Sequence, residues 1–147
     1  MFHPISPPSS TGRGPCVGTR HGMILLGLAL LIGTPAQAGT AAEQLAGYSA
    51  QAGAAASPAR GQQFFNSLHG RTWSCASCHG SSPTAAGRHA STGKSIAPLA
   101  PAFQPDRFTD SAKTEKWFRR NCNDVVGREC SAGEKADVLA WLLTLKP

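Results

Sequence analysis

The feature that most constrains this chain is the sequence SCASCHG at residues 74–80. Cys75, Cys78 and His79 have the spacing C-x-x-C-H there, which is the attachment signature of haem c. In such a site the two thiols bond covalently to the haem vinyl groups, and the histidine binds the iron from one face. We therefore predict one covalent haem c with His79 as its first axial ligand. The second axial ligand is the question on which function depends.

The N-terminal residues have the pattern of a cleavable export signal. Basic residues precede an apolar run at residues 23–33, and AQA at residues 36–38 is a small-x-small cleavage site. The apolar run is shorter than the roughly twenty residues that a membrane-spanning helix needs. We therefore predict a signal peptide at residues 1–38, a single domain at residues 39–147, and export to the periplasm.

Removal of the signal peptide changes both the charge and the cysteine count. Loss of Arg13 and Arg20 leaves 12 Lys+Arg against 8 Asp+Glu, which lowers the net charge from +6 to +4. This mild charge suits an acidic redox partner, and no basic run with interleaved aromatic residues indicates nucleic-acid binding. The remaining four cysteines fall into two pairs, Cys75 with Cys78 and Cys122 with Cys130. In an exported protein, this even number is consistent with two thioether links and one disulfide.

Two other chemistries use cysteines at the spacing of the motif. A zinc site would need Cys122 and Cys130 as further ligands, but the export signal and the eight-residue offset of this pair argue against it. A thioredoxin-like redox pair belongs to a βαβ pattern, which the sequence lacks. Haem attachment is therefore the favoured interpretation.

Four helices are predicted, and no segment has the sustained alternation of a strand. Capping boxes and apolar periodicity place them at residues 40–53, 57–68, 110–121 and 131–145. Residues 81–107 form a long stretch rich in Pro, Gly, Ser and Thr. Irregular loops of this length are uncommon in compact domains, so we expect the haem to order it.

The second axial ligand cannot be methionine. Ordinary class I cytochromes use a methionine sulfur at this position, which raises the reduction potential. The only methionines, Met1 and Met23, lie within the predicted signal peptide. The iron must therefore take another ligand or keep the position open.

Several side chains are candidates for this ligand. His89 in the long loop could swing across the haem, whereas His69 lies close to the motif on the proximal side. Lys94 would first have to lose its proton, and a cysteine thiolate would have to give up its disulfide. Asn121 lies four residues after Trp117, so both share a helix face, and the tryptophan would suit a haem edge. Because asparagine also often ends helices, the residues alone leave His89 and Asn121 open.

The chain resembles the SHP family (sphaeroides haem protein) of small class I cytochromes c. Three segments carry the resemblance: GKSIAPLAP at 93–101, PDRFTDSAKTEKWFRRNCNDVVGREC at 105–130 and GEKADVLAWL at 133–142. The resemblance covers most of residues 41–145. It implies an all-α class I cytochrome c fold at residues 39–147, with about four helices around one covalent haem c and a long loop that wraps it. Gly61 and an aromatic residue of the second helix, Phe64 or Phe65, would then cross Trp141 of the last helix.

The same resemblance implies the rest of the haem site. Asn121 would be the second axial ligand, with a disulfide between Cys122 and Cys130 beside it. The carbonyl of Pro98 would accept a hydrogen bond from His79, because a ligating imidazole usually donates its other N–H. An amide is a weak, hard ligand that ferrous iron holds poorly. Asn121 would therefore leave on reduction and open the iron to O₂, NO or CO.

The expected function is that of an exported electron-transfer cytochrome, not an enzyme, which binds O₂ or NO once reduced. The resemblance implies a dihaem cytochrome c or a membrane cytochrome b as electron donor, and we expect a monomer. The alternative is a plain periplasmic electron carrier with a ligand such as His89. A thiol–disulfide or metal-binding module without haem is a third, less favoured possibility.

Overall fold

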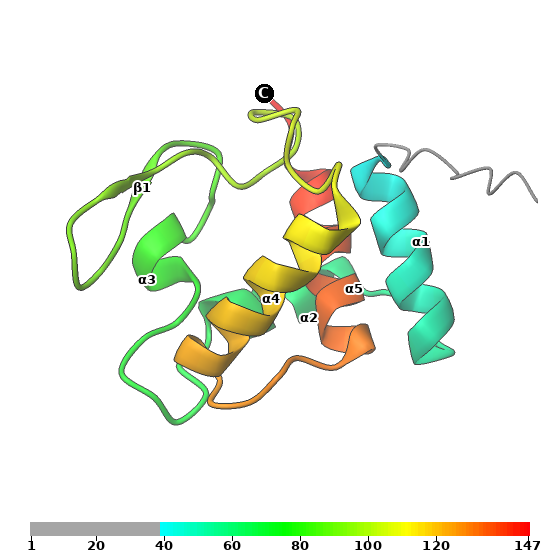
Figure 1. Cartoon of the computed structure of the whole chain (residues 1–147), viewed down its shortest axis with the longest axis horizontal. Coiled ribbons are helices and arrows are strands. Elements are labelled where there is room, and N and C mark those ends of the chain that lie inside the picture. The colour runs from blue at the N-terminus through cyan, green and yellow to red at the C-terminus, as the bar shows by residue number, and fades with distance from the viewer. Residues whose placement is uncertain (1–38) are drawn as a thin grey trace, which may run out of the picture. The chain divides into compact units, whose positions relative to one another are not determined.

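The structure of the chain is a computed structural model that describes residues 39–147, so the predicted signal peptide at residues 1–38 lies outside the described residues. The described part contains five helices and one pair of short antiparallel strands (Figure 1). In chain order these are α1 (Ala41–Ala52), α2 (Pro58–Asn66), α3 (Ala76–His79), β1 (Gly87–Arg88), β2 (Ser95–Ile96), α4 (Ser111–Val125) and α5 (Ala132–Thr144). None of these helices is long and apolar enough to cross a membrane.

The predicted helices begin where their capping residues indicated. Thr40 and Ser131 each accept a hydrogen bond from the backbone N–H of a glutamate three residues later, and that carboxylate accepts one from the N–H of the cap residue. Ser57 caps α2, and Pro58 occupies its first position. The predicted all-α fold is confirmed, while α3 and the strand pair are additions that the sequence did not predict.

Helices α2 and α5 cross at a glycine. A Cβ atom at Gly61 would lie 1.9 Å from the backbone oxygen of Asp137, so only glycine permits this approach. Next to the crossing, the rings of Phe65 and Trp141 pack with their centroids 5.0 Å apart. Phe65 and Trp141 are both buried, together with Leu142. This is the crossing that the resemblance implied, and it forms the centre of the core.

A second apolar cluster joins α1 to α5. Ala41 and Tyr48 of α1 are buried against Ala136 and Leu139 of α5. The Tyr48 ring also meets Phe118 of α4 edge-on, at a centroid distance of 5.7 Å. The last helix is therefore covered by α1 and α2, which leaves α4 to pack through fewer side chains.

Helix α4 separates two parts of the fold in Figure 1. The haem motif on α3 and the β1–β2 pair lie to one side of α4, and α1 lies to the other. Asp110 caps the start of α4 by accepting a hydrogen bond from the Lys113 N–H. The long loop at residues 80–110 connects the motif to α4, which carries Asn121.

Candidate haem site

The haem motif folds into a single helical turn, α3. The hydroxyl of Ser74 accepts a hydrogen bond from the Ser77 N–H at 3.2 Å, and the Ser77 hydroxyl accepts one from the Ser74 N–H at 3.0 Å. Gly80, with a φ of 79°, ends the turn and donates its N–H to the Ala76 carbonyl at 2.8 Å. The serines on either side of Cys75 therefore explain why the motif is helical.

The β1–β2 pair is fastened directly onto α3. A Cβ atom at Gly87 would lie 2.1 Å from the Cys78 carbonyl oxygen. The backbones of β1 and α3 are therefore in direct contact, with no room for a side chain between them. The Ala90 N–H donates to the Cys78 sulfur at 3.3 Å. These contacts hold the second cysteine of the motif in place from the loop side.

The two motif cysteines are free thiols, unlike the other cysteine pair of residues 39–147. Burial raises the pKa of the Cys75 thiol to about 11, and the neighbouring Cys78 adds to this shift. The site therefore favours an uncharged sulfur at Cys75. A thioether is uncharged, so this environment fits covalent haem attachment.

His79 is half-buried, and its ring makes no hydrogen bond within residues 39–147. Its ring centroid lies 6.1 Å from that of Phe65 in the core. Burial, together with the positive charge of Arg107, lowers the pKa of His79 to about 4. The imidazole is therefore neutral at pH 7, which is the form that binds a metal.

The loop carbonyl expected to orient His79 has another partner. Arg107 Nε donates to the Pro98 carbonyl at 2.9 Å, and Arg107 Nη2 donates to the Ala97 carbonyl at 2.8 Å. The structure thus gives Pro98 a bond to Arg107 where the resemblance implied one to His79. Sequence reasoning missed Arg107, because nothing in the letters PDRF distinguishes a loop-binding arginine from a solvated one.

Helix α4 has two different faces. Thr114 and Cys122 are buried, and Phe118 packs beside them on the core. Trp117 is 42% exposed, and Asn121 is partly exposed. Trp117 and Asn121 lie on the same side of α4, as predicted, and Asn121 is the more covered of the two, beside the buried Cys122. Such a half-covered tryptophan next to an amide fits a haem edge and its axial ligand.

Apolar side chains complete the fit to a haem. Phe64, Leu99 and Phe108 are partly buried and pack on the core around Phe65 and Trp141. Together with two free thiols and a neutral imidazole, these half-covered surfaces fit a haem group.

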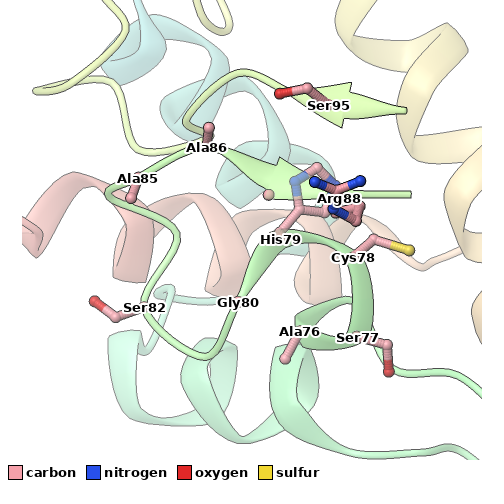
Figure 2. Close-up of a pocket in the computed structure, with 11 residues that line it drawn as sticks. Ala76, Ser77, Cys78, His79, Gly80, Ser82, Ala85, Ala86, Arg88 and Ser95 are labelled. Carbon is pink, nitrogen blue, oxygen red and sulfur yellow. The ribbon is translucent and has the colours of Figure 1, made fainter. Parts of the chain in front are cut away.

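A hollow of about 460 Å³ is lined by residues 76–80 of the motif and by the loop and strands that follow them. Figure 2 shows His79 and Cys78 of α3 at its edge, with Ser82 and Ala85 contributed by the following loop. None of its lining residues comes from α4. The hollow therefore adjoins the motif without including the Asn121 side of the site.

The other candidate ligands have local partners. His89 lies in the turn between β1 and β2, where its Nδ1 is near the Ser91 hydroxyl at 3.2 Å and the Thr92 N–H at 3.4 Å. His69 has a φ of 52°, and its Nε2 bonds to the Phe64 carbonyl at 2.7 Å. Both imidazoles thus organise the loops in which they lie.

The disulfide predicted between Cys122 and Cys130 is present, with 5.6 Å between the two Cα atoms. The turn that it encloses contains Gly127, whose φ is 82°. A Cβ atom at Gly127 would lie 2.7 Å from Arg71 Nη2, so the connector between α2 and α3 rests on this turn. Arg71 also brings a positive charge to the C-terminal end of α4, where it complements the helix dipole.

The chain is similar in sequence and in structure to known proteins. The family model named Domain of unknown function (DUF1924) matches residues 51–142. Cytochrome c-type protein SHP of Cereibacter sphaeroides is 54% identical over 121 residues, which cover 78% of this chain and 93% of that protein. The solved structure of oxidized SHP, an oxygen binding cytochrome c, matches with a TM-score of 0.69 and 53% identity, and the match covers 73% of this chain and 98% of that one. A solution structure of Methylophilus methylotrophus cytochrome c'', described as giving insight into haem-ligand detachment, has a TM-score of 0.62 and 38% identity, with 73% and 94% covered.

Proposed function

The chain belongs to the DUF1924 family and to the SHP family of c-type cytochromes, and from that premise we propose that it is an exported electron carrier that binds a diatomic molecule once reduced. Its cofactor is one covalent haem c, and like its relatives it is a cytochrome rather than an enzyme. The haem iron supplies a one-electron couple and, when a ligand position is open, a binding site for O₂, NO or CO.

The motif residues hold the haem. Cys75 and Cys78 form the two thioether links, and His79 is the proximal ligand. The buried, neutral environment of Cys75 and the neutral imidazole of His79 support these roles. Trp117, Phe108 and Leu99 cover the apolar edges of the group.

Asn121 is the second axial ligand. The observation that carries this assignment is that Asn121, which is only partly covered, lies on the same side of α4 as the exposed Trp117. Residues 39–147 also contain no methionine that could take the position. His89 and His69, by contrast, have partners within their own loops.

Asn121 withdraws when the iron is reduced. Its amide oxygen is a hard donor, which suits the ferric ion better than the ferrous ion. Cys122 is held to Cys130, so the backbone of the next residue stays in place and only a short movement of the amide is needed. The described oxygen binding of SHP and the described ligand detachment of cytochrome c'' support this behaviour in the present chain.

The setting of this activity follows from the N-terminus and the charge. Residues 1–38 direct export to the periplasm, where the domain at residues 39–147 receives electrons as a monomer. An acidic dihaem cytochrome c or a membrane cytochrome b is the donor, because the mature domain carries a net positive charge.

Optical spectra of Asn121 variants test this proposal. Asn121→Leu removes the amide at similar volume, so the ferric protein is expected to change from low-spin to high-spin. The reduced protein, wild type or variant, is expected to bind CO. His89→Ala is the matched control and should leave the ferric spectrum unchanged. A low-spin ferric Asn121→Leu protein, or a reduced wild type that refuses CO, contradicts the proposal.

A further inference from the structure

Helix α4 is fastened to the start of α5 at two points. Cys122 is joined to Cys130, the residue before the Ser131 cap of α5. Seven residues earlier on α4, Glu115 accepts a hydrogen bond from Lys135 Nζ at 2.7 Å. This ion pair joins the first half of α4 to α5.

The two points lie along one edge of α4. At about 100° per residue, Cys122 is within about 20° of Glu115 around the helix and about 10 Å further along its axis. Trp117 and Asn121 are roughly 200° and 240° from Glu115 on the same wheel. The helix is therefore attached along one edge, with Trp117 on the far side and Asn121 about 120° from that edge around the helix.

A helix that is attached at one point can rotate about that point, whereas two attachments fix its orientation. Without the ion pair, the first half of α4 is held to the other helices mainly by the packing of Phe118 on Tyr48, which allows α4 a small turn about Cys122. Lys135 is suited to prevent this movement. Its side chain is only 13% exposed, and its Nζ lies 5.4 Å from the centre of the buried Tyr48 ring. A lysine confined in this way holds its partner in a defined position.

We propose that Lys135 and Glu115 are a positioning pair that holds α4 at the angle at which Asn121 reaches the haem iron. The inference rests on the proposed function, because it presupposes Asn121 as the ligand. Without the pair, α4 turns about the disulfide, which draws Trp117 back from the haem and rolls Asn121 out of line. Asn121 then competes less well with an added ligand.

Displacement of Asn121 by imidazole in the ferric holoprotein measures this effect. Lys135→Met and Glu115→Gln are each expected to raise the affinity for imidazole by about two- to fivefold, the range of a partly exposed ion pair. The two changes alter the net charge in opposite directions. An equal rise in both therefore reports the position of α4 and excludes a change of electrostatic potential at the iron. The double variant should match the single ones.

Arg60→Met is the matched control. Arg60 forms an ion pair of the same length, 2.7 Å, with Asp137, but it joins α2 to α5 and does not involve α4. It should lower the melting temperature without changing imidazole affinity. Unchanged imidazole affinity in Lys135→Met and Glu115→Gln, or an equal rise in Arg60→Met, overturns the inference even if Asn121→Leu behaves as proposed. A ferric spectrum unaffected by Asn121→Leu overturns the ligand assignment and this inference together.

Discussion

Arg107 has two effects within the long loop between the C-x-x-C-H motif and α4. Its guanidinium binds the carbonyls of Ala97 and Pro98, and within residues 39–147 it forms no ion pair. Its charge also lowers the pKa of the His79 imidazole. One residue therefore holds the loop and places a positive charge near His79, the proposed proximal ligand.

Replacement of Arg107 separates these two roles. Arg107→Leu is expected to lower the reduction potential by up to about 60 mV, a tenfold change for a one-electron couple, because a nearby positive charge disfavours the ferric ion. Arg107→Lys keeps the charge and loses the forked bonds, so it should lower stability while largely preserving the potential. Spectroelectrochemical titration of both variants is the measurement. An unchanged potential in Arg107→Leu would show that its charge does not reach the iron.

Among the elements, the α2–α5 crossing carries the core. Helix α5 buries Leu139, Trp141 and Leu142, and its approach to α2 depends on the missing side chain of Gly61. The same contact brings Phe65 to within 6.1 Å of the His79 ring, measured between centroids. The packing of two helices thus positions Phe65 beside His79.

Gly61→Ala tests this dependence. The added Cβ atom meets the Asp137 backbone, which is not a flexible group, so the helices must separate. We expect a loss of about 3 kcal/mol or more in the free energy of unfolding, measured by denaturant titration of the ferric protein. Gly47→Ala is the control, because nothing lies within 4 Å of its added Cβ atom. This exposed position in α1 should gain about 0.5–1 kcal/mol from its higher helix propensity.

At the scale of the whole molecule, attachments converge on the first turn of α5. Cys130 holds α4 covalently, Lys135 pairs with Glu115, and Glu134 pairs with Arg128 at 2.6 Å. The bond to Arg128 lowers the pKa of Glu134, and the bond to Lys135 contributes to a lowered pKa of Glu115. Two of the three attachments therefore depend on ionised carboxylates.

Stability is consequently expected to fall in acid. A carboxyl group whose pKa is lowered by folding stabilises the native state above its unfolded pKa, and this contribution is lost as the pH falls through the folded value. The free energy of unfolding should therefore decrease below about pH 4.5. In the Glu115→Gln, Glu134→Gln double variant the decrease should be shallower. Equal slopes for wild type and variant in pH-dependent unfolding would contradict this account.

The sequence predicted the parts of this molecule that depend on local patterns. Capping pairs located helices α1 and α5, and the two cysteine pairs were assigned from their spacing and from the resemblance. It did not predict contacts between distant segments. Lys135 and Glu115 are 20 residues apart, and Arg71 meets Gly127 across the fold, so neither contact has a periodic signal. The bond from Arg107 to Pro98 was missed because it requires the three-dimensional path of the loop.

The edge-wise attachment of α4 has a consequence for protein engineering. Because the backbone is held beside residue 121 by a covalent link and before it by an ion pair, the side chain at this position can be exchanged without redesign of the helix. With Asn121 as the proposed axial ligand, histidine, methionine or lysine at position 121 would each approach the iron from the same backbone position. The chain is therefore a host in which the chemistry of the proposed ligand can be varied while the backbone that carries it stays in place.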